Sequence, residues 1–146
     1  MISKNTNASF VYFSLASKQV VSVEPDKSTW DISFTSYTHV YPDGMPYIVA
    51  GVISNRNIVR VAAISKEFKD IDYSDFLAAS FGSSINVIGF DWKAYNFDTG
   101  VYAVDPNKSF LVKTVNGKVY KLRFLDYYDE FGQKGAPTME LGELVP

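Results

Sequence analysis

Apolar and polar residues alternate with the two-residue period of β-strands along most of this chain. The clearest case is the segment FLVKTVNGKVYKLRFLD, residues 110–126, in which Asn116 and Gly117 separate two runs of strand-forming residues. Asn-Gly supplies the two positive-φ positions of a type I′ turn, so the segment predicts a β-hairpin. Backbone chemistry and alternation alone therefore define one antiparallel pair, around which the rest of the chain is arranged.

The register of this hairpin follows from the predicted turn. If Val115 lies opposite Lys118, then Leu111 lies opposite Leu122. One face then carries Leu111, Tyr120, Leu122 and Phe124, and the other carries Phe110, Val112, Val119, Lys121 and Arg123. Because both faces hold apolar residues, we expect the hairpin to lie inside a sheet that is covered on both sides.

Further strands are expected on both sides of this hairpin. Their predicted ranges are 10–15, 19–23, 29–37, 47–54, 58–64, 85–89, 101–104 and 138–145. The first two form a hairpin joined by residues 16–18, and residues 55–57 form the tip of a second hairpin between 47–54 and 58–64. Proline, glycine and polar residues predict loops at 38–46, 91–99 and 127–137.

Residues 65–81 depart from the alternating pattern. Apolar residues there are spaced roughly as on a short helix, with Asp72 or Ser74 as its N-cap. Many short strands with one short helix predict an all-β fold, either an antiparallel sandwich or a partly open barrel. Residues 1–9 are polar and are expected to be a flexible lead-in, and residues 10–146 are expected to be a single domain.

Composition narrows the function classes. The net charge of −2 over 146 residues gives no electrostatic footprint for nucleic acid. The absence of cysteine excludes disulfides, thiolate metal sites and cysteine nucleophiles. No apolar run reaches the roughly 18 residues of a transmembrane helix, and residues 1–9 lack the apolar core of a signal peptide. Aromatic residues make up 16% of the chain, which favours a surface or pocket that binds a flat or apolar ligand.

Catalytic chemistry is sparsely represented. His39 is the single histidine, no G-x-S-x-G elbow occurs, and the simpler interpretation is a loop histidine. Acidic residues cluster at 70–75 and at 126–130, where a helix N-terminus and a solvated loop account for them. A carboxylate pair for glycoside hydrolysis can be drawn from either cluster, but no pair stands out. Gly-rich phosphate loops are absent.

A set of aromatic residues falls in predicted loops and offers a different chemistry. Together with Met45, these rings can line an apolar pocket. They are Tyr41, Tyr47, Trp92, Tyr95, Phe97, Tyr127 and Tyr128. We expect most of these rings to pack the ends of the sheet, and a ligand-contacting group among them is the alternative.

Two ordered sets of short motifs carry a family resemblance. The first set is Tyr12-Phe13-Ser14, then Val20–Val23, then Trp30-Asp31 leading to Tyr37. The second set is Phe110–Lys113, Asn116-Gly117, Lys121–Phe124 and Asp126-Tyr127, continuing through residues 132–135 into the strand at Thr138. In their shared order these motifs resemble the HmuY family of haem-binding surface lipoproteins, which act as haemophores.

The resemblance implies an all-β fold that clasps one haem in an apolar cleft, with two histidines or two methionines as axial ligands. One ligand segment falls just before the strand that contains Tyr102, where Tyr95 is the nearest suitable residue, because tyrosinate can ligate haem iron. The other falls around residues 65–74, which contain neither histidine nor methionine. The candidate haem-binding residues are Tyr95, Met45, Trp92, Phe97 and His39, with Tyr95 as the candidate iron ligand.

Three hypotheses follow. The first, implied by the resemblance, is a non-enzymatic haem or porphyrin binder at the outer-membrane surface or outside the cell. Its partners would be an outer-membrane haem receptor or host haem proteins. The second is an interaction module of the same fold that does not bind haem, suggested by the missing ligand at residues 65–74. The third is an enzyme acting on carbohydrate, which two facing carboxylates with one raised pKa would reveal.

Overall fold

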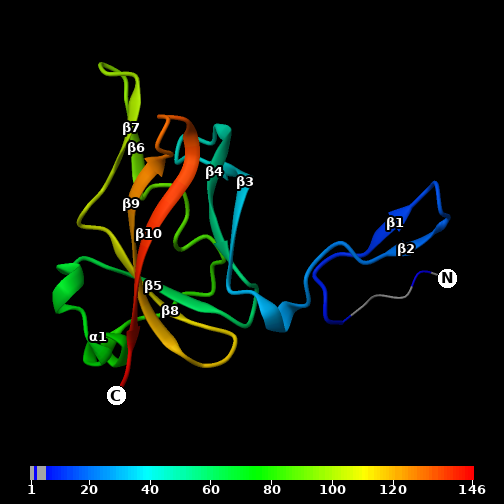
Figure 1. The fold of residues 1–146 in the computed structure, drawn as a ribbon, viewed down its shortest axis with the longest axis horizontal. Coiled ribbons are helices and arrows are strands. Elements are labelled where there is room, and N and C mark those ends of the chain that lie inside the picture. The colour runs from blue at the N-terminus through cyan, green and yellow to red at the C-terminus, as the bar shows by residue number, and fades with distance from the viewer. Residues whose placement is uncertain (1, 3–5) are drawn as a thin grey trace.

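Ten strands, one α-helix and two short 3₁₀ turns occur in the computed structural model, which describes residues 2 and 6–146 (Figure 1). The strands are β1 Tyr12–Ser14, β2 Gln19–Val21, β3 Ile32–Val40, β4 Pro46–Ser54, β5 Arg60–Ile64, β6 Lys93–Asn96, β7 Val101–Val104, β8 Ser109–Lys113, β9 Val119–Tyr128 and β10 Lys134–Leu144. The helix is α1, Tyr73–Ala78, and the 3₁₀ turns are η1, Lys27–Thr29, and η2, Phe68–Asp70. The fold is all-β with one short helix, as the alternation predicts.

The central sheet has the strand order β10-β9-β8-β5 and is antiparallel throughout. Apolar side chains alternate along its strands and are buried on both faces. The first face carries Phe110, Val112, Leu122 and Phe124, and the second carries Leu111, Val119 and Leu144. Phe68 from η2 and Phe76 from α1 pack against the second face. The expectation of a sheet covered on both sides is therefore confirmed.

The turn of the β8–β9 hairpin differs from the predicted one. Thr114 N–H donates to Lys118 O at 2.9 Å, and Gly117 N–H donates to Thr114 O at 3.0 Å. Gly117 has a φ of 83°, whereas Asn116 is not in the positive-φ region. These features define a three-residue loop, in which a type I turn is followed by a left-handed glycine, in place of the two-residue type I′ turn.

The extra loop residue moves the register by one position. Phe110 lies opposite Leu122, and Leu111 lies opposite Lys121. A shift of one residue exchanges the faces of a strand, so Phe110 and Val112 join Leu122 while Leu111 crosses to the second face. The predicted pairing of Leu111 with Leu122 is wrong, although the hairpin itself is confirmed.

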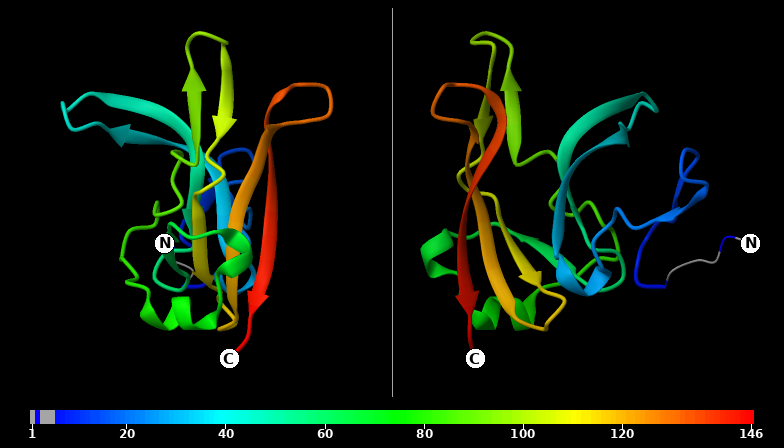
Figure 2. Two further views of the ribbon diagram at one scale, coloured as in Figure 1. Left: turned by 90° about the vertical axis from the view of Figure 1, so that its left-hand side faces the viewer. Right: turned by 45° about the vertical axis from the view of Figure 1, so that its right-hand side comes forward.

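Three hairpins rise from one end of the molecule (Figure 2). They are β3–β4, β6–β7 and the outer part of β9–β10, and each is antiparallel. The β9–β10 ladder contains register shifts between Lys134 and Thr138 and between Thr138 and Met139, which bend its outer part. The space between these hairpins holds the candidate site.

Tertiary pairing corrects several predicted boundaries. Residues 38–40 extend β3 and residues 93–96 form β6, so His39 and Tyr95 lie on strands rather than in loops. Residues 85–89 form no strand beyond a single bridge to β4. Residues 38–40 and 93–96 are too short or too mixed in pattern for local alternation to identify, and they become strands because a partner strand supplies hydrogen bonds.

The expected hairpin between β4 and β5 does not form. β4 pairs with β3, whereas β5 lies in the central sheet beside β8. Asn55 starts the connection and is fully buried, and its Nδ2 donates to Lys27 O at 2.7 Å and to Trp30 O at 2.8 Å. The asparagine therefore fixes the chain where it crosses between two sheets, instead of forming an exposed tip.

The short helix is confirmed, with Asp72 as its N-cap, although it occupies only part of the predicted segment. Asp72 Oδ1 accepts from Asp75 N–H at 3.3 Å, and Asp75 Oδ2 accepts from Asp72 N–H at 2.9 Å, which completes a capping box. Asp75 also pairs with Lys66 at 2.7 Å. No helix among the described residues has the length and apolar character needed to cross a membrane.

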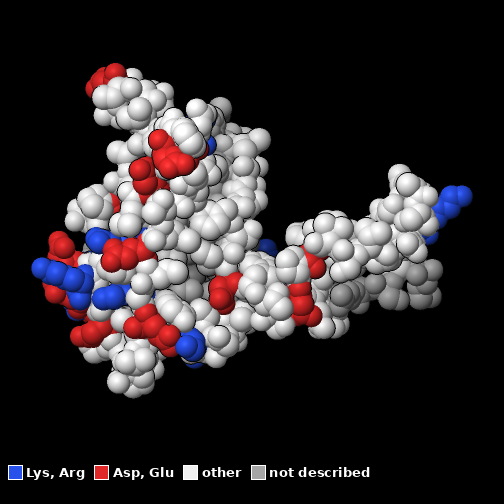
Figure 3. Space-filling model, viewed as in Figure 1, with Lys and Arg blue, Asp and Glu red and all other residues white. Residues whose placement is uncertain are grey.

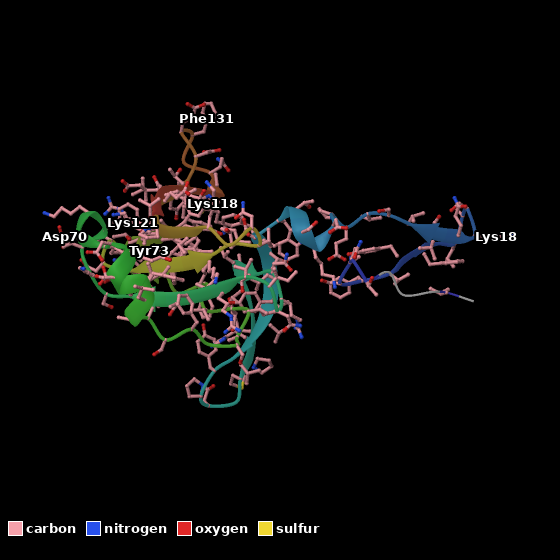
Figure 4. All side chains as sticks on the ribbon, turned by 90° about the horizontal axis from the view of Figure 1, so that it is seen from below. Lys18, Asp70, Tyr73, Lys118, Lys121 and Phe131 are labelled. Carbon is pink, nitrogen blue, oxygen red and sulfur yellow. The ribbon has the colours of Figure 1, made fainter. Side chains whose placement is uncertain are left out.

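The β1–β2 hairpin stands apart from the other sheets as an arm (Figures 1 and 3). Its two strands pair only with each other, and Leu15 near its tip is 85% exposed. At the base of the arm, Glu24 accepts from Ser9 N–H at 3.0 Å. Figure 4, seen from below, places Lys18 at the far end of the arm. The first predicted hairpin is confirmed, while the predicted lead-in 1–9 lies partly outside the described residues.

Candidate functional site

A row of aromatic rings, here called the aromatic wall, runs from the core of the sheet to the end of the β6–β7 hairpin. Consecutive rings are stacked or meet edge to face, with centroids 3.8 to 5.7 Å apart. In order, the rings belong to Phe124, Trp92, Tyr127, Tyr102, Tyr95 and Phe97. Tyr95 and Tyr102 are cross-strand partners, so the alternation of β6 and β7 places both rings on one face.

A cleft of about 220 Å³ lies between the aromatic wall and the β3–β4 hairpin. Its lining residues are Phe34, Thr35, Ser36, Ala50, Gly51, Trp92, Tyr127, Gly135 and Pro137. Phe34 is half-exposed and meets Phe124 of the aromatic wall edge to face at 6.5 Å, so its ring extends the apolar lining onto the β3–β4 hairpin. The cleft therefore has three aromatic residues and no charged side chain in its lining, which suits a flat apolar molecule.

Gly51 allows the segment before β6 to approach β4 closely. A Cβ at Gly51 would lie 2.6 Å from Gly89 O, so a larger residue would push this segment away. Val52 N–H donates to Gly89 O at 2.8 Å, and Gly89 N–H donates to Val52 O at 3.1 Å. This bridge ties the segment that leads to Trp92 against the β3–β4 hairpin and so sets the floor of the cleft.

Lys93 is a buried cation beside the cleft, with 7% of its surface exposed. Its Nζ donates to Ala50 O at 2.7 Å and lies 4.4 Å from the Trp92 ring centroid and 4.7 Å from that of Tyr127. Burial lowers the pKa of the Lys93 ammonium to about 8. Because Ala50, Trp92 and Tyr127 also line the cleft, the ammonium lies directly behind the lining.

The environment of Tyr127 in the wall favours its neutral form. Burial raises the pKa of the Tyr127 hydroxyl, and the neighbouring hydroxyls of Tyr102 and Tyr128 act in the same direction. Tyr128 is anchored to the β6–β7 hairpin, because its hydroxyl accepts from Tyr102 N–H at 2.8 Å. The ammonium of Lys93 and the carboxylate of Asp126, whose Oδ1 accepts from Tyr127 N–H at 2.6 Å, are therefore two formal charges beside the cleft lining.

Three of the sequence-predicted site residues belong to the aromatic wall. Trp92 lines the cleft but is only 2% exposed, because its ring stacks on Phe124 at 3.8 Å. Tyr95 and Phe97 are exposed and lie farther along the wall, outside the cleft lining. The structure thus brings these three residues together in one row but places only Trp92 at the cleft.

His39 and Met45 do not join this row. His39 packs edge to face against Tyr41 at 4.8 Å and against Phe90 at 4.9 Å. The alternation of β3 puts His39 on the opposite face of the strand from Phe34, which faces the cleft. Met45 lies in the β3–β4 turn and is 64% exposed. Neither residue lines the cleft.

Ligands for haem iron are scarce at the cleft. Of the lining residues only Tyr127 carries a group that ligates haem iron, and its raised pKa opposes the tyrosinate form. Residues 65–74 pack at the second face of the sheet, whereas the cleft adjoins the first face. Among the described residues, no group of three or more His, Cys, Asp or Glu is placed to hold a metal ion. The lining therefore fits the plane of a porphyrin better than it fits two axial ligands on its iron.

The acidic clusters cap turns and the helix. Asp126 Oδ1 accepts from Tyr128 N–H at 3.1 Å, and Asp129 Oδ1 accepts from Phe131 N–H at 2.9 Å. The resolved carboxyl pKa shifts of the described residues are all downward, and the cleft lining holds no carboxylate. The facing pair that a glycosidase needs is therefore not found in the described part of the chain.

Sequence analysis missed two residues that shape the cleft. Phe34 falls in the predicted strand 29–37, but its place in the cleft lining depends on how the β3–β4 hairpin is positioned relative to the sheet. One feature of the sequence could have linked Lys93 to the aromatic wall: alternation along β6 puts it on the same strand face as Tyr95. That feature could be used only once residues 93–96 were known to be a strand.

The fold and the cleft together define an all-β domain in which hairpins flank an aromatic cleft at one end of an antiparallel sheet. A model of the HmuY protein family matches residues 6–141. The chain therefore belongs to the HmuY family, and the resemblance seen in its motifs is confirmed. Members of this family are generally non-enzymatic binding proteins.

Two solved structures are distantly similar to this chain. An HmuY-like protein from Bacteroides vulgatus is 17% identical, with a TM-score of 0.44, over 90% of this chain and 82% of that one. Apo PinO from Porphyromonas gingivitis is 15% identical, with a TM-score of 0.44, over 92% of this chain and 90% of that one. No curated protein matches the chain.

Proposed function

We propose that this protein is a non-enzymatic binder of a tetrapyrrole, either haem or a metal-free porphyrin, and that it holds the ring in the aromatic cleft. The observation that carries the proposal is a single cleft whose lining includes Phe34, Trp92 and Tyr127 and no charged side chain. Stacking on these rings and removal of apolar surface from water would supply the binding free energy. Membership of the HmuY family, which is linked to haem binding, supports the same ligand.

The size of the cleft indicates how such a ring would sit. Its volume of about 220 Å³ is below the roughly 300–1,000 Å³ of enclosed ligand sites. A tetrapyrrole would therefore insert one edge between Phe34 and Trp92, while the rest of the ring extends along the exposed outer wall at Tyr95 and Phe97. The β3–β4 hairpin has no third strand beyond the single bridge at Gly89, so it can lean toward or away from a bound ring.

In this proposal the protein acts at the outer-membrane surface or outside the cell. It takes the tetrapyrrole from host haem proteins or passes it to an outer-membrane haem receptor. A carrier of this kind has to release its cargo. Partial enclosure of the ring and at most one iron ligand from the lining, Tyr127, both favour release.

Parallel titrations of the purified protein with haem and with protoporphyrin IX test the proposal. Absorbance in the Soret and visible bands is recorded for both ligands, with haem in its oxidised and reduced forms. We expect a saturable one-to-one change with each, because the lining contacts the ring rather than the iron. The Phe34→Ala variant should bind both ligands more weakly. Spectra that match the free ligands at every protein concentration would refute the proposal.

The second candidate is an interaction module of the same fold that does not bind haem. Two observations favour it: the shortage of iron ligands at the cleft, and the arm with its exposed Leu15. A hairpin that pairs with no other strand among the described residues and exposes apolar side chains is typical of a surface that meets another protein. If both titrations fail, screening of peptides, glycans and other tetrapyrroles against the purified protein tests this candidate.

A further inference from the structure

The charge of Lys93 has no counter-charge. Buried cations in folded proteins are normally paired with a carboxylate, because an unpaired charge loses its hydration without compensation. None of the ion pairs of the described residues involves Lys93, and burial alone accounts for its lowered pKa. A buried ammonium of this kind, beside a cleft, calls for a partner that is not part of the chain.

The hydrogen bonds of the ammonium are also incomplete. A lysine Nζ has three N–H donors. One reaches Ala50 O at 2.7 Å, and a second is directed at Phe90 O over a long 3.5 Å. Its other described neighbours are ring faces, those of Trp92, Tyr127 and, at 5.8 Å, Tyr102.

A second donor at the same place lacks an acceptor. Trp92 Nε1 is buried and has no hydrogen-bond partner among the described residues. The Trp92 ring lies 4.4 Å from Lys93 Nζ and lines the cleft. Two N–H groups on adjacent residues, one of them charged, therefore lie buried beside or behind the lining of a cleft, and that lining contains no carboxylate.

We infer that the ligand of this cleft is a flat apolar acid, and that its carboxylate is recognised by the Lys93 ammonium and Trp92 Nε1–H. The inference rests on the proposed function and narrows its ligand class. The protein would bind tetrapyrroles with free carboxylates more tightly than their neutral esters. The low polarity around Lys93 strengthens its attraction to a carboxylate relative to water. The aromatic wall would bind the ring, and this pair of donors would set its orientation.

A purely structural role for Lys93 makes a different prediction. If the lysine only caps the free edge of β4 through Ala50 O, the protein gains no preference for acids over esters. The affinity of each ligand form then depends only on how apolar it is. The more apolar ester therefore binds as tightly as the acid, or more tightly.

The first test compares protoporphyrin IX with its dimethyl ester on the wild-type protein, in the same mild detergent. Metal-free ligands are used so that iron ligation contributes nothing. We expect the acid to bind at least about tenfold more tightly, the factor that one charge-assisted hydrogen bond commonly gives. Equal or tighter binding of the ester would overturn the inference and leave the proposed function standing. Failure of both ligands to bind would overturn both.

The second test uses Lys93→Met, which keeps a similar shape without the charge, and Lys134→Met as the matched control. Lys134 is an exposed lysine next to Gly135 of the cleft lining. We expect Lys93→Met to bind the acid only as well as the ester, with ester affinity unchanged, while Lys134→Met keeps the wild-type preference. Circular dichroism verifies that both variants are folded. An unchanged preference in folded Lys93→Met, or an equal loss in Lys134→Met, would contradict the inference.

Discussion

Trp92 stacks on Phe124 with ring centroids 3.8 Å apart and ring planes 15° from parallel. Both rings are almost fully buried, and Phe124 also contacts Phe34 and Phe110 edge to face. This pair is where the core of the central sheet becomes the floor of the cleft. The same contact therefore stabilises the fold and positions the ring against which a ligand would pack.

Replacing Phe124 should destabilise the protein strongly. We expect Phe124→Ala to lower the free energy of unfolding by about 3–5 kcal/mol, because it leaves a cavity under Trp92 that the surrounding strands cannot fill. Urea unfolding followed by circular dichroism measures the change. The exposed Phe131 at the β9–β10 tip (Figure 4) serves as the control, since Phe131→Ala should alter stability by less than about 0.5 kcal/mol. Similar losses in the two variants would argue against this account.

Two replacements of Tyr127 separate its ring from its hydroxyl. Tyr127→Phe keeps the ring that lines the cleft and should bind protoporphyrin IX within about twofold of wild type, whereas Tyr127→Ala should bind about tenfold more weakly. Haem spectra of Tyr127→Phe add a second readout. If the visible bands of bound haem change in Tyr127→Phe, the hydroxyl ligates iron. Unchanged affinity in Tyr127→Ala would remove this ring from the site.

Tyr95 and His39 should differ in their effect on haem binding. Tyr95 meets Tyr102 at 5.1 Å within the aromatic wall, while His39 packs with Tyr41 on the far face of β3. We therefore expect Tyr95→Ala to weaken haem binding by a few-fold and His39→Ala to leave it nearly unchanged. Haem titrations of both variants beside wild type provide the measurement. Equal affinities for all three proteins would exclude Tyr95 from the site.

Burial of Lys93 should make stability depend on pH. Its pKa falls from 10.5 when exposed to about 8 in the folded protein. Between these values the unfolded chain binds more protons, so the free energy of unfolding rises with pH across this window. The shift corresponds to a cost of about 3 kcal/mol below pH 8, where both states are protonated.

The variant Lys93→Met isolates this effect from the titration of other groups. We expect it to be more stable than wild type near pH 7 by roughly 1–3 kcal/mol, because the lost hydrogen bond to Ala50 O offsets part of the gain. The difference should shrink as the pH approaches 10.5. Urea unfolding of both proteins at pH 7 and pH 10 tests this. A variant that is less stable than wild type at both pH values would show that the ammonium is stabilising.

Much of the fold could be predicted because its signals are local. Alternation located the β8–β9 hairpin and the final strand, and Asp72 marked the start of α1 through capping chemistry. The register of β8–β9 was missed by one residue, because Asn116-Gly117 is compatible with both a two-residue and a three-residue loop. A single backbone angle at Asn116 decided which residues share a face with Leu122.

The site was harder to predict because it depends on pairings between distant segments. The row of rings exists because Tyr127 in β9 meets Tyr102 in β7 and Trp92 before β6. Aromatic content suggested an apolar surface or pocket, but it could not indicate which rings would share one. Lys93 looked like an ordinary loop lysine, and its burial follows only from the approach of β4 to the segment before β6.

Asn55 should be the most sensitive polar residue in the connections. It is fully buried, and its Nδ2 ties Lys27 O and Trp30 O to the crossing between β4 and β5. Asn55→Ala leaves both carbonyls without this donor, so we expect a loss of about 2–4 kcal/mol in the free energy of unfolding. The neighbouring exposed Arg56 supplies the control, because Arg56→Ala should change stability by less than about 0.5 kcal/mol.

The same pair of variants tests how the arm is attached. Because residues 27–30 connect the arm to β3, Asn55→Ala should also speed proteolysis between Glu24 and Asp31 under native conditions, whereas Arg56→Ala should not. Limited proteolysis with mass spectrometry locates the cuts. Wild-type stability together with a wild-type cleavage pattern in Asn55→Ala would mean that other contacts, such as the bond from Val115 N–H to Asp31 Oδ1 at 2.7 Å, suffice to hold this connection.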